Sequence, residues 1–196
     1  MRIRHRTIAI IGMMGVGKTS IIKRIVSDSF SEDYKTTLYD QVEYNQEFDN
    51  VMYKLSIRDT QGVLPGAPIP DSTDPWFNHL DNCVGLIFVY AVDQKDTLTD
   101  IEKYYGAICD YFFMEQIPAI LVGNKRDIQQ RGVTEEDGRA LSEKLGMPFV
   151  EVSAKEENDE NLPNLFPAIL HEIEKGNDDY HGTSPLQSNE GICNLL

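Results

Sequence analysis

The first residues whose types and spacing could do chemistry form the segment GMMGVGKT at residues 12–19. It matches the P-loop pattern G-x-x-x-x-G-K-[ST], whose glycines let backbone N–H groups converge on phosphate oxygens. Lys18 is placed to reach the β- and γ-phosphates, and the Thr19 hydroxyl is a ligand for Mg²⁺. A glycine turn with a surface lysine is the alternative, but the apolar run before the segment and the helical pattern after it favour a P-loop. The segment therefore predicts a magnesium-dependent nucleotide site.

Three later polar segments each follow an apolar run: DTQG at residues 59–62, NKRD at 124–127 and SAK at 153–155. Ligands of open parallel sheets bind outside the carboxyl ends of the strands, so these segments are expected beside the P-loop. NKRD standing alone would be an ordinary polar turn. Kinases and ATPases also carry a P-loop, so the choice of base depends on these later segments.

The elements that must position these segments alternate along the chain. Apolar or alternating runs predict strands at residues 7–11, 41–48, 51–59, 84–92, 119–122 and 149–152, with 41–48 and 51–59 paired as a hairpin. Helical patterns follow the P-loop and occupy residues 97–114, 134–146 and 162–174. This order predicts the α/β class: a doubly wound, mostly parallel six-stranded sheet with one antiparallel edge strand and helices on both faces.

Two stretches depart from that alternation. Residues 62–75 contain Pro65, Pro68, Pro70 and Pro75, so a continuous helix is excluded and a long irregular loop is expected. Residues 176–196 have too little apolar content to pack. We therefore expect one domain at residues 1–175 and a flexible tail at 176–196.

The composition restricts the partners. With 32 acidic against 18 basic side chains, the net charge of −14 repels phosphate backbones, so nucleic acid is not expected as a partner. Hydrophobic residues make up 41% of the chain, enough for one core, and we expect a monomer. The three cysteines lack C-x-x-C spacing, which favours a cytoplasmic location, and Cys83 and Cys109 are expected to pack as small apolar residues.

Taken together and in this order over residues 7–174, the four segments resemble the motifs of the Ras superfamily of small GTPases. DTQG corresponds to its D-x-x-G motif, and NKRD and SAK to its base-reading motifs. The resemblance implies a P-loop NTPase G domain that binds GDP or GTP with Mg²⁺, hydrolyses GTP and acts as a signalling or trafficking switch. The absence of room for the extra helix of Rho proteins, and of paired tail cysteines, favours a Ras-like branch.

Guanine chemistry agrees with that resemblance. The Asp127 carboxylate can accept hydrogen bonds from N1–H and the 2-amino group of guanine, whereas adenine lacks both donors. By resemblance, the base contacts also involve Asn124, Lys125 and Phe30 on the ring and the backbone N–H of Ala154. The implied nucleotide-binding set is Gly15, Val16, Gly17, Lys18, Thr19, Ser20, Phe30, Tyr34, Thr37, Gly62, Asn124, Lys125, Asp127, Ser153, Ala154 and Lys155.

The implied metal ligands are Thr19, Thr37 and Asp59, and the implied catalytic residues are Lys18, Thr37 and Gly62. An alternative for Thr37 is that it merely begins a strand, since β-branched residues favour strands. Effector, exchange-factor and activating proteins are expected to bind through residues 30–42 and 60–80. The aromatic pair Trp76-Phe77 is either such a contact or part of the core.

The last four residues, Cys193-Asn-Leu-Leu196, have the C-a-a-X arrangement that favours geranylgeranylation of Cys193. Asn194 is a poor first aliphatic residue, and the tail has no lysine cluster or second cysteine. One prenyl chain would anchor weakly, as a peripheral attachment to the cytosolic face of a membrane.

Two departures from the family touch hydrolysis. Val63 occupies the position of the family's water-positioning glutamine, whereas Gln61 lies two places earlier, and Met14 replaces a P-loop glycine beside the γ-phosphate. These changes predict intact binding with slow hydrolysis. Two function classes stay open: a slow GTPase that cycles as a membrane-linked switch, and an interaction module that nucleotide stabilises but that hydrolyses GTP negligibly. A small-molecule kinase would not need the base-reading segments.

Overall fold

The computed structural model describes residues 3–33, 39–64, 66–68, 70 and 73–178, with side chains described up to residue 175. Tyr34, Thr37 and Cys193 lie outside the described residues, so the expectations for them stay predictions. The flexible tail was predicted to begin at residue 176, but the last helix continues to Asp178. The rest of the predicted tail lies outside the described residues.

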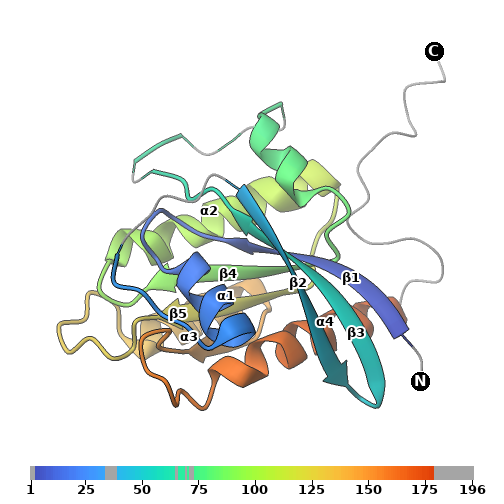
Figure 1. The fold of residues 1–196 in the computed structure, drawn as a ribbon. Helices are drawn as coiled ribbons and strands as arrows, with labels where there is room; N and C mark the ends of the chain where they lie inside the picture. Colours follow the sequence, from blue (N-terminus) through green and yellow to red (C-terminus); the bar gives the residue numbers. More distant parts are fainter. Residues whose placement is uncertain (1–2, 34–38, 65, 69, 71–72, 179–196) are drawn as a thin grey trace.

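Six strands form one sheet in the order β2-β3-β1-β4-β5-β6. Their bounds are β1 Ile3–Ile11, β2 Tyr39–Phe48, β3 Val51–Thr60, β4 Gly85–Ala91, β5 Ala119–Asn124 and β6 Phe149–Glu151. Every neighbouring pair is parallel except β2 and β3, which form the predicted hairpin with β2 at the edge (Figure 1). The predicted fold class is confirmed.

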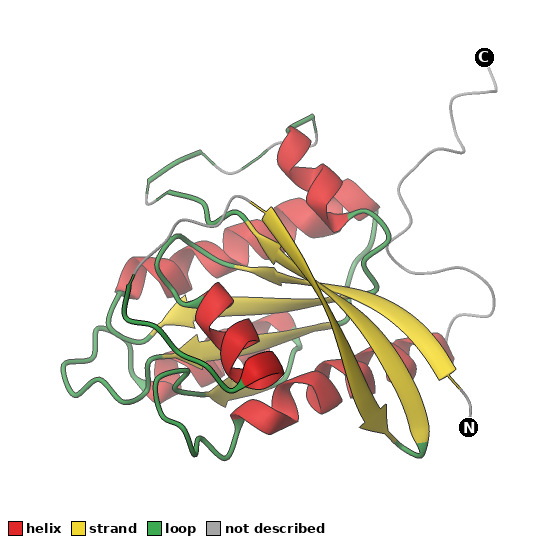
Figure 2. Ribbon diagram, viewed as in Figure 1, coloured by secondary structure: helices red, strands yellow, loops and turns green. Residues whose placement is uncertain are grey.

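Helices cover both faces of this sheet (Figure 2). The α-helices are α1 Lys18–Ser27, α2 Lys95–Phe112, α3 Glu135–Leu145 and α4 Leu165–Asp178, and the 3-10 helices are η1 Pro75–Leu80 and η2 Leu162–Asn164. One buried apolar cluster lies between the sheet and α1 with α4, and a second lies between the opposite face and η1, α2 and α3. The alternation of apolar runs along the chain therefore produces a three-layer domain.

Strand β1 begins four positions before the predicted strand at 7–11. Its first half pairs with β3, with Arg4 opposite Tyr53. Arg4 and Arg6 both form ion pairs with Glu174 of α4, which ties the start of the chain to the last helix. The sequence of this half contains Arg4, His5 and Arg6 and therefore shows no apolar run. It forms a strand because it pairs with β3, which lies far away in the sequence.

Helix boundaries differ from the predictions in two places. Helix α2 begins and ends two residues before the predicted bounds of 97–114. At its start, Thr97 lies inside the first turn, where its hydroxyl donates to Gln94 O at 2.6 Å. The predicted helix at 162–174 begins with the 3-10 turn η2, and regular α-helix starts only at Leu165. It ends at Asp178, four residues after the predicted end. Pro163 in that turn cannot donate a backbone hydrogen bond. Helix α3 has the predicted capping box between Thr134 and Asp137.

The proline-rich stretch after Gly62 contains no helix among its described residues before η1 begins at Pro75. Helix η1 is held from two sides. Phe77 is buried and stacks on Tyr111 of α2, with ring centroids 4.3 Å apart. Of the two alternatives for the aromatic pair, Phe77 therefore belongs to the core. On the other side, the Arg58 guanidinium of β3 donates to the carbonyl oxygens of His79 at 2.9 Å and Asp81 at 2.6 Å.

Within the described part of the chain, no helix has the length and apolar character needed to cross a membrane. Cys83 and Cys109 are buried, as expected for small apolar side chains. Burial raises the pKa of the Cys83 thiol to about 12.

Candidate functional site

A cavity of about 580 Å³ lies at the carboxyl edge of the parallel strands. Its walls come from the P-loop, the start of α1, residues 30–33, the D-x-x-G segment, the NKRD segment and the SAK segment. Its size suits a nucleotide-sized ligand. The sheet order explains the convergence, because β1, β3 and β5 all end at this edge.

The P-loop wraps the start of α1, as its glycines require. Gly17 has φ 97°, and a Cβ placed there would come within 2.2 Å of the Asn124 side-chain nitrogen. Gly62 faces the loop from the other side, where an added Cβ would lie 2.9 Å from Lys18 Nζ. Both glycines allow close approach of backbone and side chain that any larger residue would prevent.

Lys18 is buried, and its ammonium group donates to the carbonyl oxygens of Gly12 at 3.0 Å and Met13 at 3.1 Å. Burial lowers the Lys18 pKa to about 8, and the nearby Asp59 charge opposes that shift. Among the described residues, the hydrogen bonds of this ammonium group go to neutral carbonyl oxygens, so an anion in the cavity would stabilise it strongly.

Thr19 and Asp59 meet at the foot of the P-loop, where the Thr19 hydroxyl donates to Asp59 Oδ2. The second oxygen, Asp59 Oδ1, is buried and has no hydrogen-bond partner within the described part of the chain. Burial also raises the pKa of Asp59. A carboxylate with an orphaned buried oxygen beside a hydroxyl fits a hard divalent cation such as Mg²⁺, which these two groups would hold directly or through water.

Asn124 connects the base-reading segments to the P-loop. It lies at the end of β5 rather than after it, and it is buried. Its side-chain NH₂ donates to Val16 O at 2.8 Å, and its oxygen accepts from the Ala154 N–H at 3.2 Å. One side chain therefore sets the relative position of three motifs that are far apart in sequence.

Asp127 lines the cavity and accepts a hydrogen bond from the Ser153 hydroxyl at 2.6 Å. Its neighbour Lys125 has φ 67°, and its ammonium group contacts both carboxylate oxygens of Asp93 at 3.3 Å. Asp93 was missed from the sequence. Its position directly after the strand at 84–92, at the ligand-binding edge, was the available signal.

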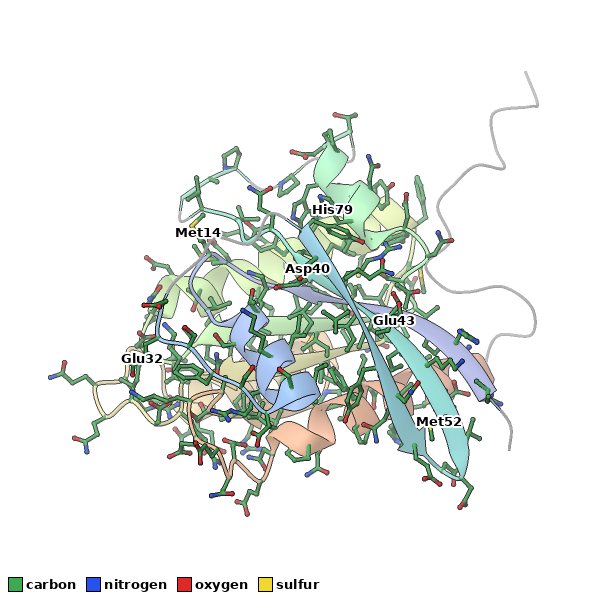
Figure 3. The ribbon with its side chains drawn as sticks, viewed as in Figure 1. Met14, Glu32, Asp40, Glu43, Met52 and His79 are labelled. Carbon is green, nitrogen blue, oxygen red and sulfur yellow. The ribbon has the colours of Figure 1, made fainter. Side chains whose placement is uncertain are left out.

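Glu32 and Lys155, which both line the cavity, form an ion pair at 2.9 Å. Glu32 lies on the same side of the molecule as Met14 of the P-loop (Figure 3). The Arg24 guanidinium lies 6.0 Å from the centre of the Phe30 ring. Glu32 is a second residue that the motifs did not single out.

Not every predicted residue faces the cavity. Its walls include Gly15, Gly17, Lys18, Thr19, Ser20, Phe30, Gly62, Asn124, Lys125, Asp127, Ala154 and Lys155. Val16, Asp59 and Ser153 are buried behind the wall and act through the contacts described above. Met14 and Gly62 line the cavity, whereas neither Gln61 nor Val63 is among the lining residues.

Fold and cavity together define a P-loop nucleotide-binding domain of the α/β class. Comparison with known proteins identifies the family. The Ras family model matches residues 7–175. The chain is 31% identical to the Ras-related protein SEC4 of Saccharomyces cerevisiae over 169 residues, which cover 86% of this chain and 74% of the relative.

Two further relatives agree. The GTP-binding protein Rheb homolog 1 of Caenorhabditis elegans is 31% identical over 171 residues, covering 87% of this chain and 79% of the relative. The Ras-like protein rasW of Dictyostelium discoideum is 30% identical over 173 residues, covering 88% and 76%. The chain belongs to the Ras family of small GTPases.

Proposed function

We propose that the chain is a guanine-nucleotide switch that binds GDP and GTP with Mg²⁺ and hydrolyses GTP slowly. The observation that carries the proposal is the convergence of the P-loop, D-x-x-G, NKRD and SAK segments on one cavity. The Lys18 ammonium group would bind the β- and γ-phosphates, and backbone N–H groups of residues 15–20 would complete the cradle.

The base end of the cavity supports guanine. Asp127 offers a carboxylate whose orientation is fixed by the Ser153 hydroxyl. Guanine presents two adjacent N–H donors to such a carboxylate. Adenine has neither donor and would cover the half-buried Asp127 carboxylate without pairing it, at a cost of about 1–3 kcal/mol. Phe30 and the Lys125 stem would cover the two faces of the ring.

Magnesium fits the pair formed by Thr19 and Asp59. The bound metal would neutralise phosphate charge, and Asp59 Oδ1 would gain the partner that it lacks. Thr37 is proposed as a further ligand from the sequence alone.

Two residues near the phosphate end of the site, Val63 and Met14, support slow hydrolysis. Phosphoryl transfer needs an aligned attacking water and stabilisation of charge on the equatorial oxygens. The Val63 side chain has no hydrogen-bonding group and packs against the apolar cluster on the α2 face. Met14 places a bulky side chain at the cavity wall, where an activator's arginine would have to approach.

The alternative function, a nucleotide-stabilised interaction module, differs only in turnover. Single-turnover hydrolysis of bound GTP, with and without a cell extract, separates the two. A switch loses its GTP at a measurable rate that the extract accelerates. An interaction module retains GTP for as long as it stays folded.

The nucleotide itself provides the test of the main proposal. Protein purified without added nucleotide should release GDP or GTP on denaturation, identified by chromatography. Labelled GTP should be displaced by unlabelled GDP but not by ATP. Equal competition by ATP would contradict the assignment of the base-reading residues.

Attachment to membranes is proposed through prenylation of Cys193. Intact-mass measurement of protein from eukaryotic cells should show the prenyl group, and Cys193→Ser should move the protein to the soluble fraction. An unmodified Cys193 with Asn-Leu-Leu still attached would contradict this part. Effectors and regulators are proposed to bind residues 30–42 and 60–80.

A further inference from the structure

One buried carboxylate, Asp159, has no part in the site as described above. Its side chain has no exposed surface and lies behind the cavity, in the loop between β6 and η2. A buried carboxylate is costly unless it is fully paired, so its partners indicate what it is for.

All four partners that Asp159 has among the described residues are donors. Oδ2 accepts from the Ser153 backbone N–H at 2.7 Å and faces Arg126 Nε at 3.0 Å. Oδ1 accepts from the backbone N–H groups of Asn161 at 2.9 Å and Leu162 at 3.0 Å. Oδ2 thus binds both base-reading segments, and Oδ1 binds the start of η2.

The two donors to Oδ2 flank Asp127. Arg126 directly precedes it in the NKRD segment, and the Arg126 backbone N–H also donates to Val152 O at 3.1 Å. Ser153 donates its hydroxyl to Asp127 Oδ1 while its own N–H is held by Asp159. The position of the Asp127 carboxylate therefore depends on the carboxylate of Asp159, which does not line the cavity.

We infer that Asp159 is a positioning residue for guanine recognition: it clamps Arg126 and Ser153 together and so fixes the orientation of Asp127. The inference rests on the proposed guanine-nucleotide site. This role predicts an effect on base selectivity. A misplaced Asp127 would lose its contact with the 2-amino group of guanine, whereas the P-loop would still bind the phosphates.

The substitution Asp159→Asn keeps the shape but removes acceptors. In either flip of the amide, its NH₂ group faces two donors and can pair with neither. Arg126→Met is the second variant. It removes the side-chain half of the clamp and leaves the three backbone donors to Asp159 in place, so the loop keeps its backbone contacts. Glu156→Gln is the matched control, because Glu156 also faces Arg126, at 3.8 Å, but is 51% exposed.

The experiment compares the dissociation constants of GDP and IDP, which lacks the 2-amino group, for the full chain with Mg²⁺. We expect the preference for GDP over IDP to fall about tenfold in Asp159→Asn, equivalent to about 1.4 kcal/mol, and about threefold in Arg126→Met. The control should stay within about twofold of wild type.

A purely structural role would lower the unfolding temperature of the variants and leave the GDP to IDP ratio unchanged. If the wild-type chain prefers GDP to IDP and both variants keep the same preference, the positioning role of Asp159 is overturned and the proposed guanine site is not. Failure of the wild-type chain to bind GDP, or to distinguish it from IDP, would overturn the proposed guanine site and this inference with it.

Discussion

The backbone N–H of Met14 donates to the carbonyl oxygen of Val63 at 2.9 Å, and Met13 and Val63 form a parallel bridge. This contact ties the P-loop to the residue that follows the D-x-x-G motif. The Val63 side chain turns toward the apolar cluster on the α2 face. The cavity therefore receives no hydrogen-bonding group from the position where the family carries its glutamine.

Val63→Gln should raise the single-turnover rate of GTP hydrolysis. A glutamine amide is disfavoured in the apolar cluster and can instead reach the attacking water, while the backbone bond to Met14 is kept. Gln61→Ala should leave the rate nearly unchanged, because Gln61 does not line the cavity among the described residues. The opposite ranking, with Gln61→Ala abolishing hydrolysis, would show that this chain has relocated its catalytic glutamine.

Asp127→Asn should shift preference from guanine to xanthine nucleotide by about tenfold or more. Xanthine carries a carbonyl in place of the 2-amino group, and the asparagine NH₂ can donate to it. Competition of XDP against labelled GDP measures the shift. Asp110→Asn, at an exposed position of α2, is the control. A variant that loses GDP without gaining XDP would argue against direct contact between Asp127 and the base.

Nucleotide binding should take up a proton at about pH 9 but not at about pH 7, because the Lys18 pKa of the free protein is about 8. Below that pKa the ammonium group is charged both before and after binding. Above it, the free amine is neutral and the phosphates restore the charge. Calorimetry of GDP binding in buffers of different ionisation enthalpy counts the protons. Equal uptake at both pH values would contradict a lowered Lys18 pKa.

Arg58→Met should lower the free energy of unfolding by about 2 kcal/mol, because two carbonyl oxygens at the end of η1 lose a charged donor. His79 of η1 also stacks on Tyr39 of β2, with ring centroids 4.9 Å apart, and it lies beside the start of that strand (Figure 3). Urea unfolding gives the stability, and hydrogen exchange at residues 77–80 should become faster. Lys54→Met, exposed on the same strand, should change stability by no more than about 0.5 kcal/mol.

Local patterns in the sequence determined the elements and the motifs. Continuous apolar runs predicted the buried strands, and Thr134 with Asp137 predicted a capped helix start, because both signals are contained within a few residues. The four motifs predicted one shared ligand site because each follows a strand and ligands collect at that edge of a parallel sheet. The choice of guanine came from the resemblance to the Ras superfamily and from the Asp127 carboxylate.

Contacts between distant segments were decided only by the tertiary structure. No local pattern around Arg4 or Arg6 predicts their ion pairs with Glu174. Likewise, no local pattern around Arg58 predicts its hydrogen bond to a carbonyl oxygen of η1. In the sequence, Asp159 is one of several acidic residues in a loop. Only the fold shows that Arg126 and Ser153 contact the same oxygen of its carboxylate. A side chain's type sets which partners satisfy it, but burial and chain path decide which partner it meets.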